Sequence, residues 1–202
     1  HLLDISHEET DVHETCKHLV QILGQGGWLS HAIAGVEYGG IANSIDTRSI
    51  CLARETLAWH NGLADFAFAM QGLGSGAISI IGTPEQKKQY LPRVLNGRAI
   101  AAFALSEATA GSDVAAMQCQ AEIKNNQYII NGEKTWISNG GIADFYVLFA
   151  RTNDAPGSRG ISAFIVDART VGLSVVEKIH VIAPHPLARL NLNNVCIPIS
   201  QR

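Results

Sequence analysis

Apolar residues in the first part of the chain recur at spacings of three and four, the pattern of amphipathic helices. We predict helices over 14–23, 50–62 and 64–81, followed by one that begins at Thr83 and runs toward Pro92. The start of this last helix combines a Thr cap, Pro at the first helical position and an acidic residue in the first turn. The residues expected on the buried face of the first helix are Cys16, Leu19, Val20 and Leu23.

Glycine is unusually frequent in the third predicted helix, which contains Gly72, Gly74 and Gly76. Glycine lowers helix stability, but it also lets another segment approach the helix backbone closely. We therefore expect this helix to pack tightly against its neighbours.

After Arg98 the pattern changes to short β-rich runs separated by turn residues. An apolar run over 99–105 predicts a buried strand. Further strands are predicted over 117–123, 127–130, 134–138, 145–150, 161–166, 173–179 and 190–199. Residues 124–126 should form a hairpin turn, and Asn131-Gly132 should separate two strands. Many short strands at this spacing indicate a barrel or sandwich.

The predicted fold class is therefore α+β and multidomain. An all-α helical domain is expected over 1–98, and an all-β, barrel-like domain over 99–202. The β domain carries the candidate ligand loops described below.

Composition excludes several classes of protein. The chain has 202 residues, 47% hydrophobic and 16% charged, which is typical of a folded protein. The net charge of −3, without a cluster of Lys and Arg, argues against nucleic-acid binding. We expect no membrane span, because the most apolar run, 99–105, is far shorter than the ~18 residues required.

The four cysteines (Cys16, Cys51, Cys119 and Cys196) are scattered, with no CxxC pair. This spacing does not favour a zinc site or a disulfide framework, so we predict no metal and mostly buried, reduced thiols. His13 and His18 are interpreted as part of a solvated helix face. The chain begins without Met and stops at Arg202 without a natural ending, so we expect a fragment of a longer protein.

Two segments of the β domain carry candidate chemistry. In 103–113, a predicted strand leads into a loop of small and hydroxyl residues, whose backbone N–H groups could approach a ligand. Taken alone, this loop is better interpreted as an ordinary strand exit than as a ligand loop. In 131–141, Trp136 lies beside hydroxyl residues and a Gly-rich turn, which suits a planar cofactor. Taken alone, Trp136 is better interpreted as a core residue.

Together, the two segments resemble the acyl-CoA dehydrogenase family. Residues 106–113 read Ser-Glu-Ala-Thr-Ala-Gly-Ser-Asp, where the family has Ser/Thr-Glu-Pro-x-Ala-Gly-Ser-Asp, and 131–140 match its Asn-Gly-x-Lys-x-Trp-Ile-Ser/Thr-Asn-Gly. Segments 37–40, 82–92, 143–152 and 160–166 are also similar to the family. The resemblance runs from about 27 to 198. One departure is clear: Ala108 and Thr109 stand where the family has Pro after the loop Glu, and this change should loosen the loop.

The resemblance implies a helical domain, a β domain and a third, four-helix domain that this chain does not contain. It also implies that FAD binds through Phe103, Leu105, Ser106, Gly111, Ser112, Trp136, Ile137 and Ser138. Ser106 would hydrogen-bond the flavin ring, Trp136 would pack on it, and Ser138 would lie near the hydride-accepting N5. Gly111 and Ser112 would contact the cofactor's pyrophosphate or the acyl-CoA substrate.

The activity implied is α,β-dehydrogenation of an acyl-CoA thioester to the enoyl-CoA, an oxidoreductase reaction of fatty acid or amino acid catabolism. The family's catalytic base belongs to the third domain, so no catalytic residue is assigned in this chain, and the chain alone should be inactive. Glu107, although it lies in the loop, is interpreted as structural. Asp113 should brace the loop, and Arg151 should anchor a strand end.

Two alternatives stay open: a flavin oxidase or monooxygenase of the same fold, and a non-catalytic relative that acts in binding or assembly. For the dehydrogenase, the resemblance implies an electron-transferring flavoprotein as acceptor and a homotetrameric assembly. We expect the bacterial cytoplasm as its location, with the mitochondrial matrix as the alternative. His180 and His185 flank an extended Pro-containing loop, and no direct role is assigned to them.

Overall fold

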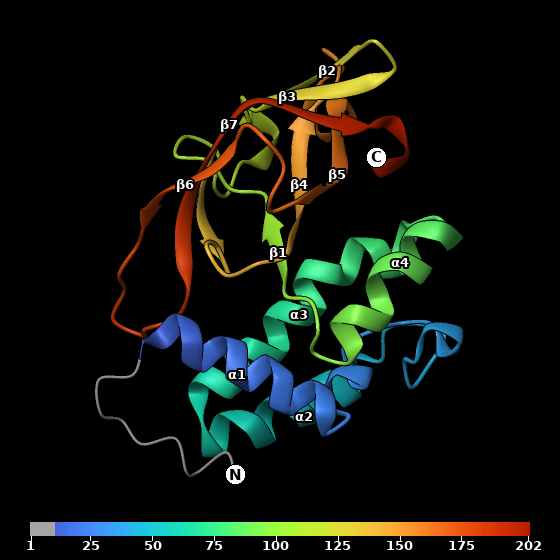
Figure 1. Cartoon of the computed structure of the whole chain (residues 1–202), viewed down its shortest axis with the longest axis vertical. Coiled ribbons are helices and arrows are strands. Elements are labelled where there is room, and N and C mark those ends of the chain that lie inside the picture. The colour runs from blue at the N-terminus through green and yellow to red at the C-terminus, as the bar shows by residue number, and fades with distance from the viewer. Residues whose placement is uncertain (1–10) are drawn as a thin grey trace. The chain divides into compact units, whose positions relative to one another are not determined.

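The computed structural model describes residues 11–202, which divide into two compact units (Figure 1). The helical unit contains the described residues up to Ala101 together with Val181–Pro186. The strand unit contains Ala102–His180 and Leu187–Arg202. The α+β class predicted from the sequence is confirmed.

The helical unit is built from four α-helices, each of which starts at a residue that caps it with a side-chain oxygen. The caps are Asp11, Asp46, Asn61 and Thr83. Thr83 and Gln86 form a complete capping box at the predicted helix start. The four helices are α1 (Val12–Gln25), α2 (Thr47–His60), α3 (Gly62–Ile81) and α4 (Pro84–Leu95), with short 3₁₀ turns η1 (Trp28–His31) and η2 (Val36–Tyr38) between α1 and α2.

Helix α3 packs closely against the segment that leads into the strands. The buried amide of Gln71 accepts from the backbone N–H of Ala101 at 2.9 Å and donates to the carbonyl of Ala99 at 2.8 Å. A Cβ on Gly74 would lie 2.7 Å from the carbonyl carbon of Ala101, so only glycine fits there. The close packing expected of this helix is confirmed at Gly74, whereas a Cβ on Gly76 would meet no atom within 4 Å.

Helix α3 also bears on the expectation of no membrane span. Among residues 11–202, α3 is the one helix long and apolar enough to cross a membrane by length and composition, with 44% of its apolar window buried. The sequence analysis missed this because it considered only unbroken apolar runs. A helix of this kind is also typical of a protein core, and α3 buries the polar side chains of Gln71 and Ser75.

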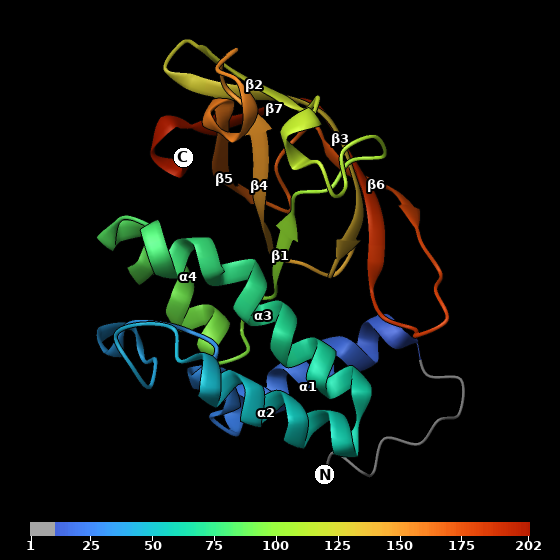
Figure 2. The ribbon, with the colours of Figure 1, turned by 180° about the vertical axis from the view of Figure 1, so that it is seen from behind.

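The strand unit is one curled, mixed sheet with the order β1-β4-β2-β3-β7-β6, in which β5 pairs with β4 (Figure 2). The pair β2–β4 is parallel, and β2–β3, β3–β7, β4–β5 and β6–β7 are antiparallel. The strands are β1 (Ala101–Ala104), β2 (Gln120–Lys124), β3 (Gln127–Ser138), β4 (Phe145–Arg151), β5 (Ile161–Asp167), β6 (Leu173–Lys178) and β7 (Leu187–Pro198), with 3₁₀ turns η3 (Val114–Ala116), η4 (Gly157–Gly160) and η5 (Ile199–Gln201).

The predicted hairpin between β2 and β3 is confirmed, but the predicted break inside β3 is wrong. Asn125 and Asn126 both have positive φ (49° and 61°), as a tight two-residue hairpin turn requires. Asn131 and Gly132 do not form a turn. They lie at an irregularity of register within one continuous strand, where Gly132 (φ 145°) approaches Cys119 so closely that a Cβ would lie 2.8 Å from its Cα.

The core of the strand unit lies on the inner face of the curled sheet. Tyr128 and Phe164 meet there edge to face, with ring centroids 4.8 Å apart. The cysteine prediction holds for Cys16 and Cys119, which are buried, and is wrong for Cys51 and Cys196, which are exposed.

Candidate functional site

The two segments singled out by sequence lie against each other in the strand unit. The backbone N–H of Thr135 donates to the carbonyl of Ser106 at 2.9 Å. Next to it, the Nζ of Lys134 donates to the carbonyl of Leu105 at 2.9 Å. Two consecutive residues of β3 therefore bind two consecutive residues of the loop after β1, so side chains from both segments can reach one ligand.

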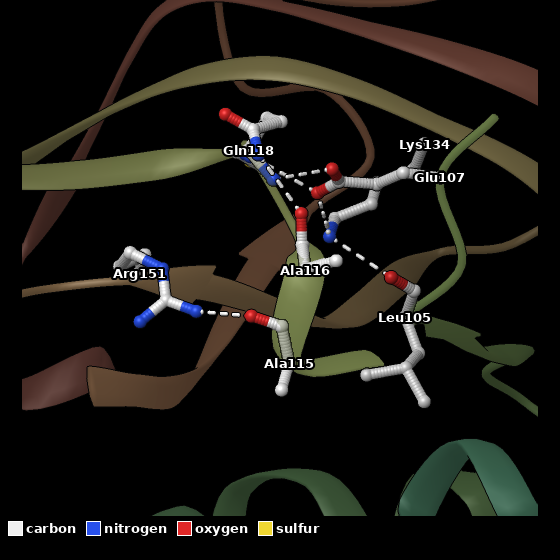
Figure 3. Close-up of polar contacts among 8 residues, drawn as sticks. Leu105, Glu107, Ala115, Ala116, Gln118, Lys134 and Arg151 are labelled. Atoms are coloured by element: carbon white, nitrogen blue, oxygen red, sulfur yellow. Dashed lines mark hydrogen bonds and ion pairs between the residues drawn. The ribbon is translucent and has the colours of Figure 1, made fainter. Parts of the chain in front are cut away.

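A buried carboxylate organises the loop itself (Figure 3). Glu107 accepts from the Nζ of Lys134 at 2.7 Å, and the two side chains are 6% and 0% exposed. It also accepts from the backbone N–H groups of Gln118 at 2.6 Å and Cys119 at 3.0 Å. Because its oxygens are engaged by the protein, the interpretation of Glu107 as structural is confirmed.

The loop closes without the proline that the family has after the Glu. The backbone groups of Glu107 and Ala110 exchange two hydrogen bonds, at 3.1 and 3.2 Å, and Ala110 is buried. Ala108 and Thr109 form the exposed tip of this closed turn. The loosening expected at these positions is therefore opposed by main-chain bonds and by the Glu107 carboxylate.

Two further residues brace the end of the loop, a role that was predicted for Asp113, whereas Arg151 was predicted to anchor a strand end. The side chain of Asp113 caps η3 by accepting from the N–H of Ala115 at 3.2 Å. The guanidinium of Arg151, at the end of β4, donates to the carbonyl of Ala115 at 2.5 Å (Figure 3). It also donates to the carbonyl of Ala155 at 3.3 Å. The backbone N–H of Arg151 donates to the carbonyl of Cys119 at 2.8 Å.

Trp136 is not a core residue. Its side chain is 58% exposed, whereas Lys134 is 0% and Ile137 is 1% exposed. Trp136 has φ of 57° and lies where the β3–β7 register shifts between Lys134 and Ile137. A bulky residue in this left-handed conformation is unusual. The bulge therefore presents the indole at the surface while both of its neighbours stay buried.

The remaining candidates differ in exposure. Phe103 is half-buried, with its ring centroid 4.8 Å from that of Phe149. Ser106 and Ser138 are half-buried. Ile137 points into the core, so any contact that it makes with a ligand would come from its backbone.

Gly111 and Ser112 are exposed at the tip of the loop. A Cβ on Gly111 would meet no atom of the chain within 4 Å. Steric crowding by the rest of the chain therefore does not require glycine at position 111, and the surface here is open to a ligand.

Burial also sets the protonation of a thiol beside the ion pair. Desolvation raises the pKa of Cys119 to about 11, an effect that the nearby Lys134 ammonium partly opposes and Glu107 reinforces. Cys119 is thus a protonated, unreactive thiol at neutral pH, and its contribution to the site is its backbone N–H.

His185 does not take part in this arrangement. His185 belongs to the helical unit, where its ring lies 4.5 Å from that of Phe66. No group of three or more His, Cys, Asp or Glu side chains within residues 11–202 could hold a metal ion.

Lys134 is the residue that the sequence analysis missed. Its only sequence signal was that it matches the Lys of the second motif, yet its ammonium bonds the loop that contains the first motif. A lysine within an apolar strand could have revealed it, because buried lysines are almost always paired and Glu107 is the acid of the neighbouring motif.

The family follows from comparison with known proteins. The model of the acyl-CoA dehydrogenase N-terminal domain matches residues 3–98, and that of the middle domain matches 102–195. The chain belongs to the acyl-CoA dehydrogenase family.

Among curated relatives, the chain is 35% identical over 156 residues to the mitochondrial 2-methylacyl-CoA dehydrogenase of Solanum tuberosum, covering 76% of this chain and 37% of that protein. It is 37% identical over 144 residues to the mitochondrial isovaleryl-CoA dehydrogenase of Oryza sativa subsp. japonica, covering 71% and 35%. The match therefore spans little more than a third of the length of these relatives.

Solved structures share the fold. The acyl-CoA dehydrogenase of Bacillus anthracis in complex with FAD superposes with a TM-score of 0.81 at 32% identity, covering 93% of this chain and 32% of that one. A chain of the electron-transferring flavoprotein structure of Acidaminococcus fermentans superposes with a TM-score of 0.83 at 27% identity, covering 98% and 59%.

Proposed function

We propose that this chain forms the flavin-binding part of an FAD-dependent acyl-CoA dehydrogenase, which converts an acyl-CoA thioester to the enoyl-CoA. The observation that carries the proposal is the direct contact between the two motif segments, Thr135 to Ser106 and Lys134 to Leu105. Membership of the family and the likeness to an FAD-bound member support it.

The residues at this contact suit a flavin. Trp136 offers an exposed indole face, and a flat aromatic surface is suited to packing on a planar ring. The hydroxyls of Ser106 and Ser138 would hydrogen-bond ring heteroatoms, and Phe103, Leu105 and the Ile137 backbone would complete the lining. The open surface at Gly111 and Ser112 would take a pyrophosphate, and Ser112 would also contact the acyl-CoA.

The bound flavin would supply the redox chemistry by accepting a hydride from the β-carbon of the thioester. The residues of this chain would bind and orient it. Trp136 and Ser138 would hold the ring against β3, and the loop after β1 would hold its other edge. The base that removes the α-proton is not assigned to any residue of this chain.

The partners of the reaction follow from the family. We propose an acyl-CoA as substrate, an electron-transferring flavoprotein as acceptor and a homotetramer as the assembly. Similar proteins occur both in mitochondria and in bacteria. We propose the bacterial cytoplasm for this one.

Visible absorption spectra of the purified complete gene product test the proposal. Anaerobic addition of acyl-CoA thioesters should bleach the flavin bands. The panel should include straight chains and the 2-methyl and isovaleryl branches, because the two plant relatives carry these names. Flavin bands that no thioester bleaches would favour an oxidase or monooxygenase, or the non-catalytic alternative. A protein that cannot take up flavin would contradict the proposal.

A further inference from the structure

We propose that Lys134 and Glu107 form a positioning pair, which holds the loop after β1 in the geometry that flavin requires. This inference rests on the proposed function. Neither side chain is assigned a contact with the cofactor, since both are buried. Lys134 acts through the backbone of Leu105, a proposed contact residue, and Glu107 acts through the backbone of Gln118 and Cys119, which follow the loop.

The pair joins three segments at one point. Lys134 comes from β3, Glu107 from the loop after β1, and the amide of Gln118 from the segment just before β2 (Figure 3). The amide of Cys119, the next residue, bonds the same carboxylate. The loop of 105–117 is thus held at its start by Lys134, which bonds Leu105, and at its end by the Glu107 carboxylate, which bonds the amides of Gln118 and Cys119. The candidate contact residues Gly111 and Ser112 lie between these fixed ends.

The lysine does more than neutralise the acid. Its Nζ donates to the carbonyl of Leu105 as well as to Glu107, at 2.9 and 2.7 Å. The N–H of the next residue, Thr135, holds the carbonyl of Ser106. Leu105 is therefore bound to β3 by the Lys134 side chain, and Ser106 is bound by the backbone N–H of Thr135. Both bonds come from residues that precede the exposed Trp136 on the strand.

Stability alone does not explain an ion pair at this position. Moving two charges out of water is costly, and well-packed apolar residues of similar volume often give equal or greater stability. Apolar packing cannot direct hydrogen bonds to a chosen carbonyl and to two chosen amides, whereas this pair does so. Its distinctive contribution is thus to geometry.

The test uses three variants of the complete gene product: Lys134→Met, Glu107→Gln and the double variant. Lys134→Met leaves a buried carboxylate without its cation, so it should also destabilise the fold. The double variant removes both charges and should recover much of that stability. Two controls are matched: Lys124→Met, which breaks the exposed pair with Glu122, and Val195→Ala, which destabilises the same unit through the core on β7.

Hydrogen exchange of the flavin-free protein gives the first readout. The backbone amides of residues 105–119 should exchange at least about tenfold faster in all three variants than in the wild type. This increase should exceed any change in exchange rate across the rest of the strand unit. Lys124→Met should leave this segment unchanged, and Val195→Ala should not loosen it selectively. Unchanged local exchange in Lys134→Met and in the double variant would overturn the proposal.

FAD affinity gives the second readout. The dissociation constant for FAD should rise about tenfold in Lys134→Met and stay raised in the double variant. Removing a residue that orients a ligand-binding group typically changes affinity by about this factor. A double variant that regains both stability and wild-type affinity would show that the pair serves folding only. If the unmodified protein binds no FAD, the proposed function fails, while the exchange data still decide whether the pair positions the loop.

Discussion

The backbone N–H of Thr135 donates to the carbonyl of Ser106, so that residues from two separate motifs share one hydrogen bond. A ligand that contacts the loop after β1 is therefore within reach of β3, where Trp136 and Ser138 flank the buried Ile137. Substitutions in either segment should affect the same cofactor. Each substitution should nevertheless act differently, because the side chains differ in exposure and chemistry.

Replacing Trp136 with Ala should weaken FAD binding by on the order of 1 kcal/mol, or about fivefold, because an aromatic contact adds roughly that much beyond its buried area. Fluorescence titration of the apoprotein measures the change. Trp136→Gly should weaken binding equally while leaving the unfolding temperature unchanged or higher, because glycine adopts φ of 57° without strain.

Trp59 on α2 provides the matched control for this experiment, since it is 86% exposed and belongs to the helical unit. Trp59→Ala should leave FAD affinity unchanged. Equal affinity in the wild type and the two Trp136 variants would contradict the placement of the ring against this indole.

Replacing Ser138 with Ala should slow flavin reduction roughly tenfold to a hundredfold with a smaller effect on FAD binding, because a hydroxyl aimed at a reacting centre acts mainly in the transition state. Anaerobic rapid mixing with the preferred acyl-CoA measures the rate. Ser174→Ala, at an exposed site on β6, is the control. A reduction rate unchanged by Ser138→Ala would remove this residue from the reacting edge.

Local features of this fold could be predicted from the sequence. The buried face of α1, the capped start of α4 and the hairpin between β2 and β3 depend on residues within a few positions of one another. Periodicity and turn chemistry capture such short-range preferences. The two motif segments could likewise be found, because each is contiguous.

Long-range features could not be predicted. The continuity of β3 through Gly132 depends on the partner strand β7 and on the close approach of Cys119. The exposure of Trp136 depends on a bulge whose neighbours are buried by distant strands. The pairing of Lys134 with Glu107 joins residues 27 positions apart, so the sequence indicates a need for an acidic partner but not the geometry of the pair. Each of these features is fixed by tertiary contacts rather than by local preference.

Two glycines of α3 should respond oppositely to Ala. Gly74→Ala should destabilise the fold by about 1–3 kcal/mol, because the new Cβ would lie 2.7–2.9 Å from atoms of Ala101 and the packing would have to shift. Gly76→Ala should stabilise it by about 0.5–1 kcal/mol, because alanine favours the helix and the added carbon meets nothing within 4 Å. Denaturant unfolding measures both, and equal effects would contradict the packing described for α3.

The four cysteines should divide into two classes toward a thiol reagent. Cys51 and Cys196 are exposed and should be labelled in the native protein, whereas Cys16 and Cys119 are buried and should react only after unfolding. Peptide mass mapping after alkylation at pH 8, with and without denaturant, identifies the labelled sites. Rapid labelling of Cys119 in the native state would mean that the loop opens readily from β2.

Alkaline pH should destabilise the protein through its buried thiols. Burial raises the pKa of Cys16 from 9.0 to about 12 and that of Cys119 from 9.0 to about 11. Below pH 9 both thiols are protonated whether the chain is folded or unfolded, so neither changes stability. Above pH 9 the unfolded chain loses these protons first, and each thiol lowers the free energy of unfolding by about 1.4 kcal/mol per pH unit, up to its folded pKa. Urea unfolding from pH 7 to 10.5 should show a shallower alkaline decline in Cys119→Ala than in the wild type, whatever the variant's stability at pH 7. Parallel declines in the two proteins would contradict the raised pKa.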